Sequence, residues 1–228
     1  MLRNVVRLPF VARSVAAVLF AAALVSAGPS SSVASGAEPA ADAKPLFDGK
    51  SFDGWEGNLQ AFRLQDGAIV GGNLKEKIPR NEFLCTTRTY GDFELRVKFK
   101  VLGDGVNAGI QFRTKRIPNH HEVSGYQADV GQKYWGSLYD ESRRKKILAQ
   151  ADLEAVLKVV KPNDWNEYVI RAEGPRIRFW LNGLQTIDYT EADDSIERTG
   201  VIALQIHGGP PSEAWYKDVV ITELSAAK

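Results

Sequence analysis

The sequence has only one cysteine in 228 residues, so an internal disulfide is impossible. A large domain can be stable without disulfides, and the scarcity of cysteine therefore does not argue against export. It also means that no cysteine follows the apolar N-terminal run as a lipid attachment site. We expect Cys85 to be a small buried hydrophobic residue on a strand and not a nucleophile.

The sequence also has no large excess of charge of one sign, since it contains 29 Lys and Arg residues and 28 Asp and Glu residues. A protein that binds nucleic acid needs a basic face, so we predict no nucleic-acid partner. The hydrophobic share of 44% is enough for one globular domain with a substantial core.

Long hydrophobic runs are limited to "SVAAVLFAAALVSA" at 14–27, which is shorter than the about 20 residues of a membrane span. Three arginines precede this run, and small residues follow it, which is typical of a secretory signal peptide. We predict a signal peptide at 1–27, although cleavage near Ala37 is an alternative. The mature protein would then be periplasmic or extracellular, with no membrane partner.

The segment that follows, "GPSSSVASGAEPAADAK" at 28–44, is rich in small residues, serine and proline. This composition predicts a disordered linker and places the folded domain at 45–228. Without the three arginines of the signal peptide, the 29 basic residues fall to 26 against 28 acidic ones.

Helical periodicity is scarce, with one helix-like segment at 149–160 before Pro162. The dominant period is two: "DFELRVKFKV" at 92–101 alternates strictly between apolar and charged residues, which indicates an antiparallel strand. Asn182 and Gly183 join two strand-like runs and favour a type I′ hairpin turn. Further strand-like runs lie at 67–72, 107–114, 125–131, 168–174, 200–209 and 216–224. We predict an all-β jelly-roll β-sandwich, since a domain of this length is large for an immunoglobulin-type sandwich.

Three of these strands carry hydrogen-bonding side chains on the face opposite their apolar residues, with small residues between them. This pattern differs from a solvated face of long charged side chains and indicates a lined groove. Ordinary exposed polar positions remain the alternative for any single residue. The polar positions are Asn107, Gln111 and Arg113 on the first strand, Gln127 and Asp129 on the second, and Gln205 and His207 on the third.

The ordered set of motifs "PLFDGKSFDGW", "YGDFELRVKFKV", "NAGIQFR", "GYQADVG", "GSLYD", "WNEYVIRAEGPRIRFWLNG" and "GVIALQIHGG" resembles the 3-keto-disaccharide hydrolase family. This family is also described as 3-keto-glucoside-1,2-lyase/3-keto-2-hydroxy-glucal hydratase domains. The resemblance runs from about Pro45 to about Leu224. It implies a concanavalin-like jelly roll, export, and an oxidised carbohydrate substrate supplied by an upstream sugar 3-dehydrogenase.

The resemblance implies cleavage of 3-keto-glycosides, with hydrolase activity overall. A ketone at C3 acidifies the hydrogen on C2, so a base can remove it while the C1 substituent leaves, and water can then add to the 2-hydroxy-glucal. Such a site needs one base, one group that stabilises the enolate oxygen and one proton source. It does not need the paired carboxylates of a glycosidase.

We expect Asp129 and His207 to act as base or acid and Arg113 to stabilise the oxyanion. No cofactor is certain, but a divalent metal held by Asp129 and His207 could replace Arg113 as the electrophile. The expected substrate-binding residues are Asn107, Gln111, Gln127, Gln205, Trp135 and Tyr139.

Structural roles are the alternatives for these residues. Asp129 and Arg113 could form an ion pair, and His207 could bind the backbone at a strand end. We expect 120–122 ("HHE") and 141–146 ("ESRRKK") to lie in exposed loops, although Tyr139, Asp140 and Arg143 could form a lid over the groove.

Two other functions compete with 3-keto-glycoside cleavage. A carbohydrate-binding module would use the same groove and the same aromatic residues without catalysis. An ordinary glycosidase is the weaker rival, because "QAD" at 127–129 has an amide where a glucanase of this fold has its nucleophile.

Overall fold

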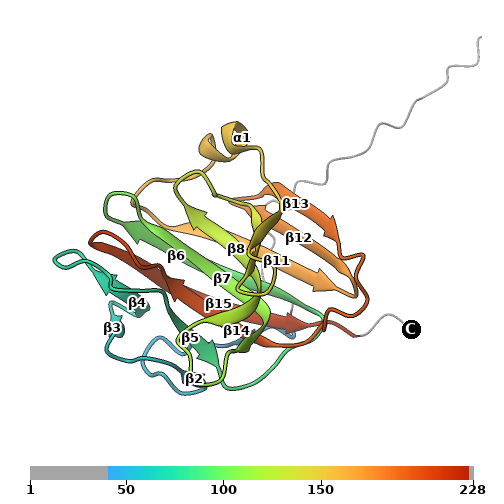
Figure 1. Ribbon diagram of the computed structural model, residues 1–228, viewed down its shortest axis with the longest axis horizontal. Helices are drawn as coiled ribbons and strands as arrows, with labels where there is room; N and C mark the ends of the chain where they lie inside the picture. The colour runs from blue at the N-terminus through green and yellow to red at the C-terminus, as the bar shows by residue number, and fades with distance from the viewer. Residues whose placement is uncertain (1–40, 226–228) are drawn as a thin grey trace, which may run out of the picture. The chain divides into compact units, whose positions relative to one another are not determined.

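The computed structural model describes residues 41–225, and the predicted signal peptide and most of the predicted linker lie outside this range. The described residues form two antiparallel sheets (Figure 1). The eight-stranded sheet has the order β13 (Leu184–Thr190), β12 (Arg176–Leu181), β11 (Asn166–Glu173), β6 (Phe93–Leu102), β15 (Ser212–Glu223), β4 (Ala68–Asn73) and β3 (Phe62–Gln65), and β1 (Lys44–Pro45) pairs with β15. The seven-stranded sheet has the order β10 (Lys146–Ala149), β9 (Leu138–Glu141), β8 (Val123–Gly131), β7 (Asn107–Arg116), β14 (Val201–Ile206), β5 (Glu82–Thr86) and β2 (Trp55–Glu56).

The predicted all-β jelly-roll sandwich is confirmed, and the core lies between the two sheets. Alternation along β6 buries every second residue, as expected for a strand with one solvated face. Rings from the two sheets meet in this core: Phe112 of β7 stacks on Tyr126 with centroids 5.5 Å apart and contacts Phe179 of β12 edge-on at 5.7 Å. Because side chains alternate between the two faces of a strand, the polar side chains of the seven-stranded sheet lie on its outer face.

The predicted hairpin joins β12 and β13 at Asn182 and Gly183, whose φ angles are 48° and 84°. Both values are positive, as a type I′ turn requires. The Asn182 side chain also stabilises the turn, since its Oδ1 accepts a hydrogen bond from the backbone N–H of Glu167 at 2.9 Å.

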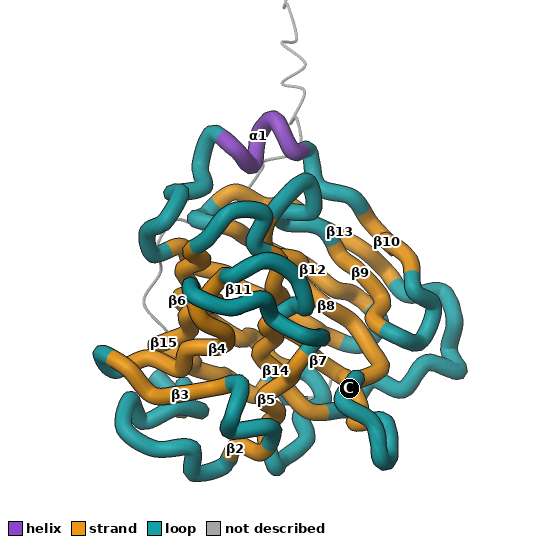
Figure 2. Tube along the Cα trace, turned by 60° about the vertical axis from the view of Figure 1, so that its left-hand side comes forward, coloured by secondary structure: helices purple, strands orange, loops and turns teal. Residues whose placement is uncertain are grey.

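The expected helix over 149–160 is much shorter. Residues Lys146–Ala149 form the edge strand β10, and only Leu153–Leu157 form a helix, α1. Asp152 caps this helix by accepting hydrogen bonds from two backbone N–H groups of its first turn. Pairing of β10 with β9 thus takes the first residue of the expected helix, Ala149, and α1 lies beyond the strand ends (Figure 2).

Cys85 lies fully buried on β5, as expected. Burial raises the pKa of its thiol to about 12. Among residues 41–225, no helix is long and apolar enough to cross a membrane.

Candidate functional site

A pocket of about 860 Å³ lies on the outer face of the seven-stranded sheet, over β8 and β9 and the loops around them. Figure 2 shows β9, β8 and β7 side by side in this sheet. The residues that line the pocket are Asn81, Asn107, Ile117, His120, Glu122, Gln127, Asp129, Tyr134, Tyr139, Glu141, Ser142, Lys145, Lys146, Ile147 and His207.

Asp129 is held firmly at the pocket wall and is only 5% exposed. Its backbone N–H donates to the carbonyl of Ser137 at 3.0 Å, and its carbonyl accepts from the hydroxyl of Tyr168 at 2.6 Å. Its side chain shares the outer face of β8 with Gln127, whose Nε2 donates to Oδ1 of Asp129 at 2.5 Å. The predicted outward pairing of Gln127 and Asp129 is therefore confirmed.

Burial raises the pKa of Asp129 to about 7, and the charge of Glu141 contributes in the same direction. The hydrogen bond from Gln127 opposes this rise because it favours the carboxylate. A carboxyl group with a pKa of about 7 can act as a base or as an acid near neutral pH.

Glu141 is a second carboxyl group of the pocket, although we expected it in an exposed turn. It lies at the end of β9, where Leu138 and Asp140 are buried and Tyr139 and Glu141 point outward to the pocket. Burial and the nearby charge of Glu122 raise its pKa to about 7. Nε2 of Gln205 donates to Oε2 of Glu141 at 3.4 Å.

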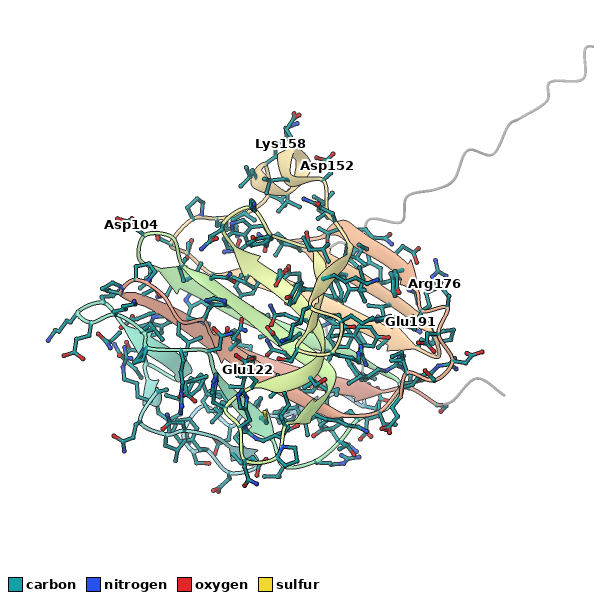
Figure 3. The ribbon with its side chains drawn as sticks, in the orientation of Figure 1. Asp104, Glu122, Asp152, Lys158, Arg176 and Glu191 are labelled. Atoms are coloured by element: carbon teal, nitrogen blue, oxygen red, sulfur yellow. The ribbon has the colours of Figure 1, made fainter. Side chains whose placement is uncertain are left out.

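The segment 120–122 is a loop with His120 exposed, as expected, but His120 and Glu122 also line the pocket. Glu122, labelled in Figure 3, precedes β8 directly, and its Oε1 accepts a hydrogen bond from Nδ2 of Asn81 at 3.2 Å. His121 points elsewhere, with its Nδ1 3.0 Å from the carbonyl oxygen of Asn81. The rings of His120 and His121 nevertheless stack, with centroids 4.4 Å apart, and only His120 and Glu122 of the three line the pocket.

His207 and Asn107 reach the pocket from the ends of β14 and β7, as predicted. The backbone N–H of His207 donates to the carbonyl of Asn107 at 3.2 Å. Nδ1 of His207 lies 2.7 Å from the carbonyl oxygen of Gly208, so this nitrogen carries the hydrogen. In the neutral ring Nε2 is then the basic nitrogen.

Arg113 does not share the pocket, and the expectation that it joins Asp129 and His207 is wrong. Its guanidinium donates to the carbonyls of Gly91 and Gly174 at 3.0 and 2.7 Å and to Oδ1 of Asp92 at 2.6 Å. The cause is a β-bulge: the register shifts after Phe112, and Arg113 has a φ of 45°. A bulge breaks the alternation on which the prediction depended.

Three expected substrate-binding residues lie elsewhere than at the pocket wall. Gln111 is buried and donates a hydrogen bond to Oε1 of Gln127, and Gln205 is buried beside Glu141. Trp135 packs against the core with its ring 6.1 Å from that of Phe99, so it serves as a loop anchor. Tyr139, in contrast, lines the pocket as expected.

The expected metal ligands do not form a metal site. Among residues 41–225, no three His, Cys, Asp or Glu side chains come together as metal ligands would. We therefore derive no step from a metal.

Comparison with known proteins agrees with the fold. Residues 42–222 match the 3-keto-alpha-glucoside-1,2-lyase-like domain. The chain belongs to this family. Membership of this family supports a carbohydrate-processing function. A comparison with curated proteins found no match.

Solved structures that resemble the chain share its fold. A candidate glycosyl hydrolase from Parabacteroides distasonis has a TM-score of 0.62 at 18% identity, covering 81% of this chain and 94% of its own. The carbohydrate-binding module CBM66 from Bacillus subtilis has a TM-score of 0.56 at 18% identity, covering 74% and 96%. The Bacillus licheniformis β-glucanase has a TM-score of 0.53 at 12% identity, covering 79% and 97%. At such low sequence identities, the similarity supports a shared fold but not a shared activity.

Proposed function

We propose that this protein cleaves 3-keto-glycosides by elimination in the pocket over β8 and β9. The observation that carries the proposal is the pair of carboxyl groups, Asp129 and Glu141, which line one pocket with pKa values raised to about 7. Membership of the 3-keto-alpha-glucoside-1,2-lyase-like family supports this choice of substrate class.

The reaction follows from the acidity that a C3 ketone gives to the hydrogen on C2. Asp129 takes this proton, the electrons form the C1–C2 double bond, and the C1–O bond breaks. The leaving oxygen then receives a proton, for which Glu141 in its protonated form is suited. Water adds to the 2-hydroxy-glucal, with its hydroxyl at C1 and a proton at C2, so the net reaction is hydrolysis.

The enolate oxygen at C3 needs a hydrogen-bond donor, and Arg113 does not serve because its guanidinium is engaged away from the pocket. Donors that line the pocket include the hydroxyls of Tyr134 and Tyr139 and the ammonium of Lys145. We assign the oxyanion role to this group because charge development in a partly buried pocket is stabilised by donors already in place.

Unpaired acceptors around the pocket support a sugar as the ligand. Oδ1 of Asn107 and Oε2 of Glu122, both at the pocket wall, and Oε1 of the buried Gln205 find no donor among the described residues. Buried acceptors without a donor are costly, and sugar hydroxyls can supply donors to the two at the pocket wall. The C3 oxidation of the sugar would be carried out beforehand by a separate dehydrogenase.

An ordinary glycosidase is the second candidate, because it also requires two carboxyl groups in one site. Incubation with a 3-keto-disaccharide and with the same disaccharide in its unoxidised form separates the two. We expect release from the keto form alone. Release from the unoxidised sugar would establish a glycosidase, and binding without release would indicate a carbohydrate-binding module.

Isotope exchange tests the chemical step itself. In D₂O, elimination followed by hydration places deuterium at C2 of the released 3-keto sugar, whereas direct displacement at C1 leaves the original hydrogen. Asp129→Asn should lower the release rate by about 10²-fold or more. Asp218→Asn, in an exposed pair with Lys98 on the other sheet, is the matched control and should leave it unchanged. Equal rates in both variants would remove Asp129 from the mechanism.

A further inference from the structure

The carboxamide of Gln127 is engaged on both sides within the protein. Its Nε2 donates to Oδ1 of Asp129 at 2.5 Å, and its Oε1 accepts a hydrogen bond from Nε2 of Gln111. Gln127 is 3% exposed and Gln111 is fully buried. An acceptor and a donor of Gln127 are thus already used, which fixes the orientation of its amide and argues against a primary role in binding sugar hydroxyls.

Gly109 provides the space in which this carboxamide lies. It is the register partner of Asp129 across β7 and β8. A Cβ atom added at Gly109 would lie 2.6 Å from Cδ, 2.7 Å from Cγ and 2.9 Å from Oε1 of Gln127. The backbone of Gly109 does not have a positive φ, so glycine is needed here for space and not for conformation.

We propose that Gln127, seated over Gly109 and oriented by Gln111, is a positioning residue that holds the carboxylate of Asp129 toward the pocket. This inference rests on the proposed function, because it takes Asp129 as the base. It differs from a substrate-binding role in that Gln127 acts through Asp129 and does not contact the sugar. The chain Gln111, Gln127, Asp129 runs from the buried middle of the sheet to the pocket wall.

Other charged groups around Asp129 are common to every variant considered and do not change between them. The titratable and charged side chains that surround the pocket from neighbouring elements are His120 and Glu122 before β8, Tyr134, Tyr139 and Glu141, Lys145 and Lys146, His207 after β14, and Tyr168 behind the sheet. A substitution at Gln127 therefore reports on the hydrogen bond from Gln127 to Asp129.

Gln127→Leu keeps the approximate size of the side chain and removes the donor. We expect kcat for 3-keto-disaccharide cleavage to fall about 10-fold with KM nearly unchanged. We also expect the acidic limb of the pH profile to move upward by about one unit, because the carboxylate loses a stabilising hydrogen bond. A raised KM with an unmoved pH profile would instead make Gln127 a substrate-binding residue and overturn the proposal.

Gly109→Ala should reproduce these effects in a milder form, because the new methyl group displaces the carboxamide. The matched control is Gly91→Ala, whose Cβ would meet only Cγ2 of Thr199 at an ordinary 3.6 Å. In a Gln127→Ala background the crowding atoms are gone, so Gly109→Ala should have little further effect. Additive effects of the two substitutions would show that Gly109 acts independently of Gln127 and would also contradict the proposal.

A measurement without substrate keeps the two hypotheses separate. The ¹³C carboxyl resonance of Asp129, assigned with Asp129→Asn, can be titrated in the wild-type protein and in Gln127→Leu. A higher midpoint in the variant supports the positioning role even if no keto sugar is cleaved. An unchanged midpoint overturns it even if the enzyme is active.

Discussion

Asp129 of β8 and Glu141 of β9 line the same pocket, and the negative charge of Glu141 raises the pKa of Asp129. Two carboxyl groups in this arrangement resist simultaneous ionisation, so near neutral pH one of them tends to keep a proton. The pair therefore supplies a base and an acid without a change of conformation.

Glu141→Gln should shift the acidic limb of the pH–rate profile to lower pH. Removing the charge of Glu141 relieves the repulsion that disfavours ionised Asp129, and the pKa of Asp129 falls. We also expect a lower maximal rate, because the proton donor is lost. The profile of kcat/KM between pH 4 and 9 provides the measurement, with Glu154→Gln on the exposed α1 as control. A shift toward higher pH would contradict the assumed interaction.

Sequence patterns predicted the strands and the outward placement of Gln127 and Asp129, because alternation holds wherever a strand is regular. The same rule failed at Arg113, where a bulge adds a residue that the sequence does not reveal. The sequence analysis missed Glu141 because β9 has only four residues and the charged residues that follow this strand resemble a solvated turn. Alternation in "LYDE", with Leu138 inward and Tyr139 outward, was the signal that could have found it.

Arg113→Met should destabilise the protein without affecting catalysis. The Arg113 side chain is 1% exposed, and its guanidinium donates hydrogen bonds to two backbone carbonyls and to Asp92, so its removal leaves buried acceptors unpaired. We expect a loss of about 3 kcal/mol in the free energy of unfolding, measured by urea denaturation. Arg176→Met, in the exposed pair with Asp188, should cost no more than about 1 kcal/mol. A large fall in kcat per folded molecule of Arg113→Met would return Arg113 to the mechanism.

Cys85 should resist thiol reagents in the folded protein. Its side chain is fully buried on β5, and its pKa of about 12 leaves almost no thiolate at neutral pH. Labelling with iodoacetamide at pH 8 should be slow in buffer and fast in denaturing urea. Rapid labelling of the native protein would mean that this part of β5 opens readily.

Asp129→Asn should stabilise the protein increasingly as the pH rises. Folding raises the pKa of Asp129 from 3.8 to about 7, so between these values the folded state retains a proton that the unfolded chain has lost. The unfolding free energy of the wild type therefore falls with rising pH in this window, and the full cost of the buried charge is present above about pH 7. The amide introduced by the substitution does not titrate and lacks this slope, so the variant should gain about 2–4 kcal/mol at pH 8 and little at pH 4. Urea unfolding of both proteins at several pH values measures the difference, with Asp218→Asn as control. Parallel stability curves between pH 4 and 8 would show that Asp129 ionises as an ordinary exposed carboxyl, and the general-base role would lose its physical support.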